Sequence, residues 1–298
     1  MEGWVPGAIG LMRLGATINS YFTDTDPGAY VAECVRHGYR AAPCPAVGIA
    51  EHDKIREIRN AFSRADVVIG EVQAWVSALD PRPDVKKKHE QAIAEALMIA
   101  DELNATCCVT VAGTLDPQDN GASDMPHPDN FREGTFDAVI DWVLRVLQTV
   151  KPRRAKLGLE MSPWTPLDSP EAYLKILKAV NHPGLAVHLD PCNAILTPRL
   201  LWSTTELINH CFNTLGPWII SCHAKDLTYS ESVAKLRHVS FVEVIPGRGT
   251  MDYRTFLRRA NTISPNLPII MEHLPEPHDY EAGARFIRNI AAEIGVSI

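Results

Sequence analysis

Four residues in the C-terminal half of the chain are of types that bind metal ions, and each closes a short apolar run. The four, with the runs that they close, are Glu160 (KLGLE), Asp190 (LAVHLD), His223 (IISCH) and Glu272 (PIIME). Carboxylate oxygens and imidazole nitrogens are ligands that divalent metals accept in proteins. We call these residues the strand-end tetrad, because the runs that they close are typical of short buried strands.

Three carboxylates can share one buried site only if a cation compensates them. Nearby like charges and burial both disfavour the ionised form of a carboxyl group. A single acidic residue at a strand end is more often a solvated loop residue or a helix cap, but four residues at matching positions are hard to explain in that way. We therefore predict that the tetrad binds one divalent metal, with Mn²⁺ favoured over Mg²⁺, Co²⁺ and Zn²⁺.

The elements that position these residues follow a regular rhythm, because short apolar runs alternate with helical patterns about eight times. This alternation predicts parallel strands joined by crossover helices, and the near-continuous apolar runs are typical of strands covered on both faces. We predict an α/β fold, a (βα)8 TIM barrel that forms a single domain over residues 1–298. A doubly wound open sheet is the alternative. The barrel is favoured because no glycine-rich phosphate turn follows the first strand and because a barrel brings many strand ends together.

The expected elements can be stated by residue range. The strands are 13–19, 39–47, 67–75, 106–113, 157–161, 185–190, 218–223 and 267–274, with a further extended piece at 239–246. The helices are 29–38, 50–64, 85–104, 131–149, 170–180, 199–214, 253–263 and 278–294. The loop 115–130 is long and rich in Pro, Asp, Gly and Asn. Because long loops in compact domains are usually functional or mobile, we predict a lid there.

Composition and charge exclude several classes of partner. The net charge of −7 argues against nucleic acid, whose phosphate backbone requires a basic surface. No apolar run approaches the ~20 residues of a membrane span, and the start of the chain lacks the pattern of a signal peptide. The seven cysteines lack paired spacing, which is typical of reduced thiols. We expect a cytoplasmic protein with a small-molecule partner and neither a nucleic-acid nor a membrane partner.

The chain resembles the xylose-isomerase-like TIM barrels, which include sugar isomerases and epimerases as well as endonuclease IV. The order Glu, Asp, His, Glu on strands five to eight carries the resemblance, together with the motifs EVQAW (71–75), HAKD (223–226) and PGRGTMDY (246–253). It covers nearly the whole chain and implies that the tetrad residues are metal ligands. In the ketose 3-epimerase branch two glutamates also move the proton, which implies this role for Glu160 and Glu272. Such barrels are usually dimers or tetramers, which implies a homo-oligomer or a partner subunit here.

Two positions depart from the ketose 3-epimerase pattern. Pro166 stands where those enzymes have a second Glu, and Asn193 stands where they have a His. Both positions bind substrate in that branch, so the departures favour a bulkier or oxidised sugar. Asn193 also argues against endonuclease IV, which has a metal-binding His at that spacing, and Arg248 stands near the place where its Asp-x-His pair is expected.

Further candidates lie close to the tetrad in sequence. Because residues two apart share a strand face, Lys225 lies on the side of His223 and His188 lies one layer below Asp190. Both are candidate catalytic residues, with a salt bridge and a satisfied core histidine as the alternatives. By the same alternation, His273 should point away from the side of Glu272. The candidate substrate-binding residues are Arg248, between two glycines, Asn193, and two tryptophans suited to stacking on a sugar, Trp75 and Trp164.

Three functions are consistent with these residues. The first is a metal-dependent sugar isomerase or epimerase, in which a carboxylate removes the proton next to a carbonyl and an enediolate forms. The second is a lyase that uses the same site to cleave 3-oxo-glycosides by β-elimination. The third is a noncatalytic sugar-binding barrel, which the presence of both glutamates disfavours.

Overall fold

Eight strands close into a barrel in the order β1-β10-β7-β6-β5-β4-β3-β2. The computed structural model describes residues 11–117 and 123–298, and all neighbouring barrel strands are parallel. With β8 and β9 set aside, each strand lies beside the previous one in the chain, and β1 meets β10. The predicted (βα)8 barrel is therefore confirmed. Its strands are β1 (Arg13–Ala16), β2 (Ala41–Pro43), β3 (Val68–Gln73), β4 (Cys107–Val111), β5 (Lys156–Glu160), β6 (Leu185–Leu189), β7 (Ile219–Ala224) and β10 (Pro268–Met271).

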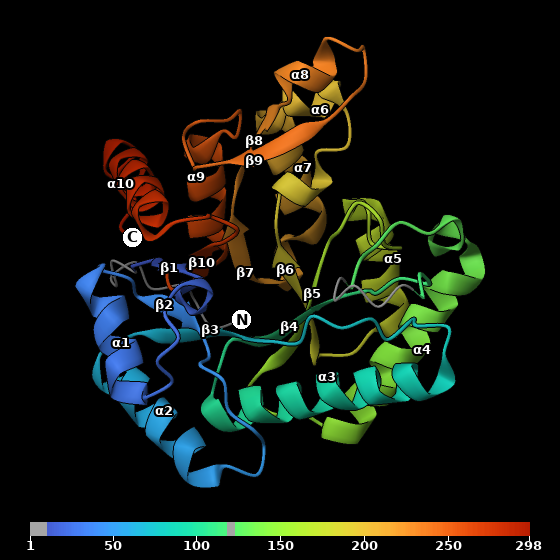
Figure 1. Cartoon of the computed structure of the whole chain (residues 1–298), viewed down its shortest axis with the longest axis vertical. Helices are drawn as coiled ribbons and strands as arrows, with labels where there is room; N and C mark the ends of the chain where they lie inside the picture. Colours follow the sequence, from blue (N-terminus) through green and yellow to red (C-terminus); the bar gives the residue numbers. More distant parts are fainter. Residues whose placement is uncertain (1–10, 118–122) are drawn as a thin grey trace, which may run out of the picture.

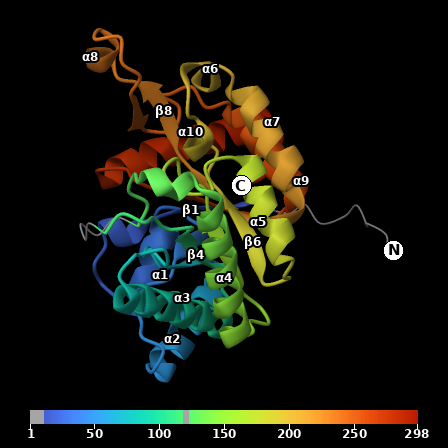
Figure 2. The ribbon, with the colours of Figure 1, turned by 90° about the vertical axis from the view of Figure 1, so that its right-hand side faces the viewer.

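Helices surround the barrel, as Figures 1 and 2 show from two sides. Several begin with a proline in the first turn, whose missing N–H group costs nothing there, and Asp26 and Ser169 each accept a backbone N–H of the helix that follows. The predicted helix 199–214 is two helices, because Trp202 and Ser203 interrupt it. The helices are α1 (Pro27–Arg36), α2 (His52–Arg64), α3 (Pro83–Leu103), α4 (Glu133–Val150), α5 (Pro170–Val180), α6 (Pro198–Leu201), α7 (Thr204–Leu215), α8 (Glu231–Ala234), α9 (Tyr253–Ile263) and α10 (Pro277–Glu293).

The core between barrel and helices is apolar and fixes the strands that carry the tetrad. Trp142 of α4 and Phe256 of α9 are fully buried, and large apolar side chains of this kind contribute about 1.5–3 kcal/mol each when buried. Tyr173 of α5 is buried too, and its hydroxyl lies 2.6 Å from the carbonyl oxygen of Leu159 and 2.8 Å from that of Ala186. This side chain therefore ties α5 to the end of β5 and to the beginning of β6.

A two-stranded antiparallel ribbon stands outside the barrel, at the top of Figure 1. Its strands are β8 (Asp226–Tyr229) and β9 (Phe241–Val244), and α8 lies between them in the chain. The extended piece predicted at 239–246 contains β9, whereas β8 was not expected. Because β8 starts two residues after β7 ends, the ribbon rises directly from the rim of the barrel.

The side chain of Asp226 fastens the ribbon to the following turn. Its carboxylate accepts backbone N–H groups of Gly247, Gly249 and Met251 at 2.8–3.0 Å. A Cβ atom on Gly249 would lie 2.2 Å from Asp226 Oδ1, so this close approach requires glycine. The HAKD and PGRGTMDY motifs are thus parts of one structure, the Asp226 turn.

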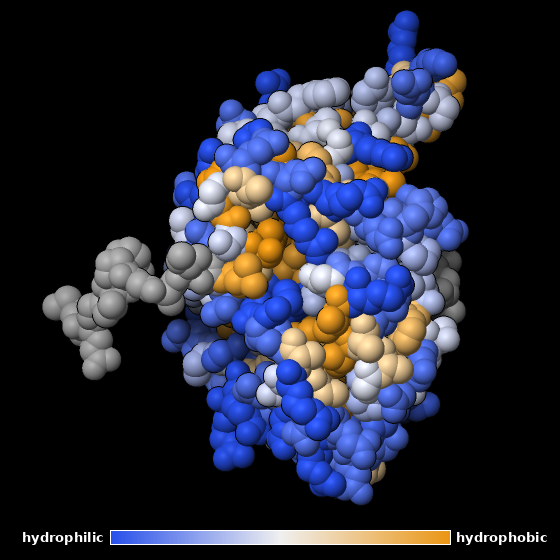
Figure 3. Space-filling model, turned by 90° about the vertical axis from the view of Figure 1, so that its left-hand side faces the viewer, coloured by the Kyte–Doolittle hydropathy of each residue, from blue (hydrophilic) through white to orange (hydrophobic). Residues whose placement is uncertain are grey.

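The surface combines hydrophilic cover with apolar patches, as Figure 3 shows for one face. Several large apolar side chains are exposed on the ribbon and its loop, namely Tyr229, Leu236, Val239 and Val242. No helix within residues 11–117 and 123–298 has the length and apolar character that a membrane span requires.

Candidate metal centre and its cavity

The structure brings the strand-end tetrad together at the rim of the barrel. Glu160 ends β5, His223 lies one residue before the end of β7, and Asp190 and Glu272 directly follow β6 and β10. One ligand atom from each residue lies within 4.8 Å of the others, and all four side chains are buried. Strand ends far apart in the sequence therefore supply a compact set of ligand atoms.

Cationic groups already lie among these carboxylates. Nδ1 of His223 is 2.8 Å from Glu272 Oε1 and 3.2 Å from Glu160 Oε1. Nζ of Lys225 is 2.6 Å from Glu272 Oε1 and 3.0 Å from Asp190 Oδ2. Glu272 Oε1 and Asp190 Oδ2 lie within ion-pair distance of Lys225, but neither oxygen accepts a well-aligned hydrogen bond from the described residues. Two buried carboxylate oxygens with spare capacity, in a set of three carboxylates and an imidazole, fit a divalent cation.

The two glutamates of the tetrad differ in proton affinity although both are buried. Burial raises the pKa of Glu160 to about 6, because it outweighs the opposing charges of His223 and Lys225. Burial also acts to raise the pKa of Glu272, but here His223 and Lys225 prevail and hold that pKa well below its ordinary value. At His223 burial is outweighed by Glu272 and the other carboxylates, which raise the pKa of the imidazole well above its ordinary value.

His188 lies behind His223, deeper in the barrel. Its Nδ1 forms a 2.7 Å hydrogen bond with Ser221 Oγ, and its ring meets the ring of His223 edge to face, with centroids 4.0 Å apart. Burial, together with the charge of His223, holds the pKa of His188 well below its ordinary value. His188 is therefore a neutral imidazole that packs against the tetrad from below.

A cavity of about 390 Å³ opens beside the tetrad, within the usual size of small-molecule sites. Glu160 and Glu272 line it, whereas Asp190 and His223 are not among the lining residues that the structure describes. The glutamates therefore face both the ligand cluster and the cavity. The lining residues are Trp75, Val111, Ser123, Asp124, Glu160, Ser162, Pro163, Asn193, Lys225, Glu243, Glu272 and His273.

The candidate substrate-binding residues divide into two groups. Trp75 lines the cavity, and Asn193 lines it while donating its Nδ2 to Glu160 Oε1 at 2.9 Å. Asn193 thus also orients a tetrad carboxylate. Trp164 and Arg248 are exposed, and neither belongs to the described lining of the cavity. Arg248 lies in the Asp226 turn instead.

Sequence reasoning missed three ionisable residues of the cavity. Glu243 comes from β9, and no sequence pattern indicated that the ribbon reaches the site. His273 was expected to point away from Glu272, and this prediction is wrong: a left-handed backbone at His273 (φ 58°) breaks the strand alternation. Its Nε2 lies 3.6 Å from Glu272 Oε2, and its Nδ1 lies 3.0 Å from Glu243 Oε2. Asp124 accepts a 2.6 Å hydrogen bond from Ser162 Oγ.

The lid predicted at 115–130 includes residues 118–122, which lie outside the described residues. Its described parts are held by Asn130, which is buried. The side chain of Asn130 accepts the N–H of Leu115 at 2.9 Å and donates to the carbonyl oxygens of Met125 and Trp164 at 3.2 and 2.6 Å. The loop therefore leads Ser123 and Asp124 to the cavity, and its action as a lid stays a prediction.

The sequence of the chain was compared with models of known protein families and with curated proteins. The model of the xylose isomerase-like TIM barrel family matches residues 31–290. No curated protein matches the chain in sequence.

Solved structures share the fold. A xylose isomerase-like TIM barrel protein from Mycobacterium smegmatis in complex with magnesium has a TM-score of 0.69 at 15% identity, over 95% of this chain and 97% of the other. D-psicose 3-epimerase from Clostridium cellulolyticum H10 with D-tagatose has a TM-score of 0.68 at 14% identity, over 96% of this chain and 100% of the other. The probable 3-DHS dehydratase AsbF from Bacillus anthracis has a TM-score of 0.67 at 15% identity, over 94% of this chain and 99% of the other. Identities this low show likeness of fold alone.

Proposed function

The chain belongs to the xylose isomerase-like TIM barrel family, and on this premise we propose that it is a divalent-metal-dependent isomerase or epimerase of an uncharged sugar. The reaction would move a proton next to a carbonyl group. One observation carries the proposal: Glu160 and Glu272 belong to the tetrad and also line the cavity. The same two carboxylates can therefore hold the ion and reach a substrate carbon.

The arrangement of side chains supports proton transfer beside a carbonyl. A divalent metal in the tetrad, Mn²⁺ by preference, would polarise adjacent carbonyl and hydroxyl oxygens and so acidify the C–H bond between them. One glutamate can take that proton, and its return to the neighbouring carbon or to the opposite face gives isomerisation or epimerisation. Lys225 also lines the cavity and can donate an N–H to the oxygen that gains negative charge.

The charge of the cavity supports an uncharged substrate. Four carboxylates line it, those of Asp124, Glu160, Glu243 and Glu272, against the cationic groups of Lys225 and His273. A phosphate or carboxylate on the substrate would face these like charges at close range. The apolar wall of Trp75 suits the apolar face of a sugar ring.

A β-elimination on the same site is a second candidate function. Lys225 and His273 place N–H donors in the cavity beyond the four tetrad residues, and His273 lies beside the carboxylates of Glu272 and Glu243. After removal of the proton, a leaving group β to the carbanionic carbon departs as the carbon–carbon double bond forms. A donor at the rim can then supply the proton that the leaving oxygen takes up. The probable dehydratase and the epimerase each share the fold of this chain.

Deuterium incorporation separates these functions. The protein, loaded with Mn²⁺, is incubated in D₂O with unphosphorylated ketoses and with 3-oxo-glycosides, and the products are analysed by mass spectrometry. Exchange at the carbon beside the carbonyl without release of an aglycone supports the isomerase or epimerase, and exchange with release supports the lyase. Phosphorylated analogues should react more slowly. If the protein binds Mn²⁺ but exchanges no compound, both enzymatic proposals are contradicted and the sugar-binding barrel is favoured.

A further inference from the structure

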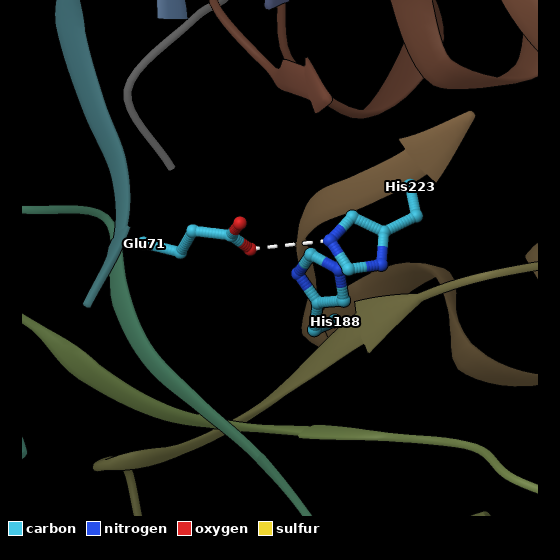
Figure 4. A group of neighbouring side chains, drawn as sticks. All are labelled: Glu71, His188 and His223. Carbon is cyan, nitrogen blue, oxygen red and sulfur yellow. Dashed lines mark hydrogen bonds and ion pairs between the residues drawn. The ribbon is translucent and has the colours of Figure 1, made fainter. Parts of the chain in front are cut away.

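One buried carboxylate near the tetrad takes no part in the proposed chemistry. Glu71 of β3 is fully buried and is not among the described residues that line the cavity. Its Oε2 lies 3.2 Å from Nε2 of His223, while Nδ1 of the same ring faces Glu160 and Glu272. Figure 4 shows the carboxylate pointing at the imidazole, with His188 beside it. Glu71 therefore contacts the side of His223 that faces away from the tetrad carboxylates, and it lies outside the described lining of the cavity.

A bulge in β3 aims this side chain inward. Ala42 of β2 pairs with Ile69, but the next residue, Pro43, pairs with Glu71, so the register skips Gly70. Bulges of this kind redirect side chains and occur often beside active sites. A Cβ atom on Gly70 would lie 2.6 Å from Ile270 Cδ1, so a larger residue at this position would require the Ile270 side chain to shift. Backbone geometry thus brings Glu71 into the barrel interior.

Both oxygens of the Glu71 carboxylate are engaged. Gln73 Nε2 donates to Oε1 at 2.9 Å, and Asn19 in turn donates to the side-chain oxygen of Gln73 at 3.1 Å. This leaves Oε2 directed at His223. The ring of His188 packs against His223 at an interplanar angle of 74°, which restricts rotation of the imidazole from another side.

This geometry has a chemical consequence for His223. A neutral imidazole that donates its Nε2–H to a carboxylate keeps a lone pair on Nδ1, and only a nitrogen with a lone pair can bind a metal. A metal that enters the tetrad would take the place of the Nδ1 proton, while Glu71 retains the proton on Nε2. Metal-binding histidines usually donate their other N–H to such an outer partner, which sets the tautomer and orients the ring. Nδ1 is the nitrogen that faces the tetrad carboxylates.

We propose that Glu71 is a positioning residue, which holds the Nε2–H tautomer and the ring orientation of His223 so that Nδ1 is presented to a metal in the tetrad. This inference rests on the proposed metal site. It extends that proposal by assigning a role to a residue outside the cavity and by explaining why β3 carries a bulge at Gly70.

A second metal site is the rival explanation. Glu71, His188 and His223 each offer a ligand atom, and these atoms lie within 4.8 Å of one another. An ion there, with another in the tetrad, would require His223 to bind metal through both nitrogens and to lose both ring protons. A tautomer set by Glu71 requires no such loss. The two explanations predict different numbers of bound ions.

Calorimetric titration with Mn²⁺ tests the role of Glu71. We expect the native protein to bind one ion per chain, Glu71→Gln to bind about tenfold more weakly, and Glu71→Ala to bind up to about 100-fold more weakly, the usual range for outer partners of a ligand. The glutamine variant keeps an acceptor for Nε2–H and should therefore fall between the other two. Glu33→Gln is the matched control, since it removes a carboxylate that lies 3.1 Å from Nε2 of another imidazole, that of His37, and is not among the described residues of the tetrad or of the cavity lining. It should change affinity by no more than about fivefold.

The tautomer of His223 provides a second measurement, which would not change if Glu71 contributed only to the stability of the fold. Two-bond ¹H–¹⁵N spectra of ¹⁵N-histidine-labelled protein, loaded with Mg²⁺, should show a proton on Nε2 of His223 in the native protein. In Glu71→Ala the signal of that Nε2–H should broaden or shift, and thermal unfolding of each variant shows whether the fold is retained. If Glu71→Ala does not fold, the isosteric Glu71→Gln decides.

The outcomes are distinct. Weaker binding in Glu71→Gln, with one ion per native chain and a protonated Nε2, supports the inference. Equal affinity in Glu71→Gln and the native protein, an unprotonated Nε2, or two ions per native chain would overturn it while leaving the tetrad site intact. Failure of the native protein to bind any Mn²⁺ would instead overturn the proposed function and, with it, this inference.

Discussion

Two buried carboxylate structures lie a few residues apart on this barrel, the Asp226 turn and the strand-end tetrad. Asp226 is 1% exposed, and the tetrad side chains come from residues that are at most 6% exposed. Around Asp226 the donors are backbone N–H groups, which the chain fixes when the turn forms. Around the tetrad the neighbours are other carboxylates, His223 and Lys225.

The difference lies in what compensates the buried charge. Burial raises the pKa of Asp226 and of Glu160 alike. At Asp226 backbone dipoles oppose this effect, so the protein itself completes the site. In the tetrad, Asp190 Oδ2 and Glu272 Oε1 accept no well-aligned hydrogen bond from the described residues. The Asp226 carboxylate is stabilised by backbone N–H donors and so fixes a turn. The tetrad carboxylates lie close to one another and lack enough hydrogen-bond donors among the described residues, which favours the binding of a cation.

The largest expected effect is a loss of activity when a glutamate of the strand-end tetrad is replaced. Glu272→Gln should lower kcat by about 10²–10⁴-fold, the usual contribution of a positioned acid or base. Its free energy of unfolding should fall only moderately, because the loss of the ion pairs with His223 and Lys225 is partly offset by weaker repulsion from the neighbouring carboxylates. Activity assays and urea denaturation of the same preparation measure both quantities. Activity within tenfold of the native protein would show that Glu272 does not move the proton.

Asp226→Asn should have the opposite profile. The amide places an NH₂ group among backbone N–H donors, so buried donors lose their acceptor and the free energy of unfolding should fall by about 2–4 kcal/mol. The affinity for Mn²⁺ should stay within a few-fold of the native value, since no tetrad atom changes. Urea denaturation and calorimetry measure these properties. A lost ion with unchanged stability would mean that the roles of the two structures are reversed.

A smaller effect is expected from the glycine of the turn. Gly249→Ala places a Cβ against Asp226 Oδ1 and the carbonyl oxygen of Leu227, which should cost about 1–3 kcal/mol. Gly134→Ala is the matched control, because no heavy atom lies within 4 Å of its Cβ position and the residue is in α4. The control should be neutral or up to about 1 kcal/mol more stable. Equal stability of the two variants would show that the Asp226 turn can rearrange to accommodate the added methyl group without loss of unfolding free energy.

The sequence predicts those features that follow from regular periodicity. The barrel follows from eight alternations of strand and helix, and the tetrad follows from the convergence of parallel strand ends in such a barrel. Both rules need only the local pattern. Trp75 and Lys225 reach the cavity for the same reason, since their strands run in the predicted direction.

Features that depend on irregular backbone escape such rules. The left-handed residue His273 reverses the side on which its ring lies, and the bulge at Gly70 changes the alternation along β3. Glu243 reaches the cavity because the Asp226 turn fixes a ribbon whose course no local pattern specifies. Arg248, an attractive candidate between two glycines, belongs to that turn and not to the described cavity lining.

Metal binding tests the central claim most directly. Asp190 is the clearest target, because it is fully buried and its Oδ2 lies in the tetrad without a well-aligned hydrogen bond among the described residues. Calorimetric titration should show one Mn²⁺ per native chain and an affinity lowered at least about 100-fold in Asp190→Asn, more than an outer partner contributes. Asp226→Asn should bind like the native protein. If the native protein binds no ion, or if Asp190→Asn binds as tightly, the tetrad is not a metal site.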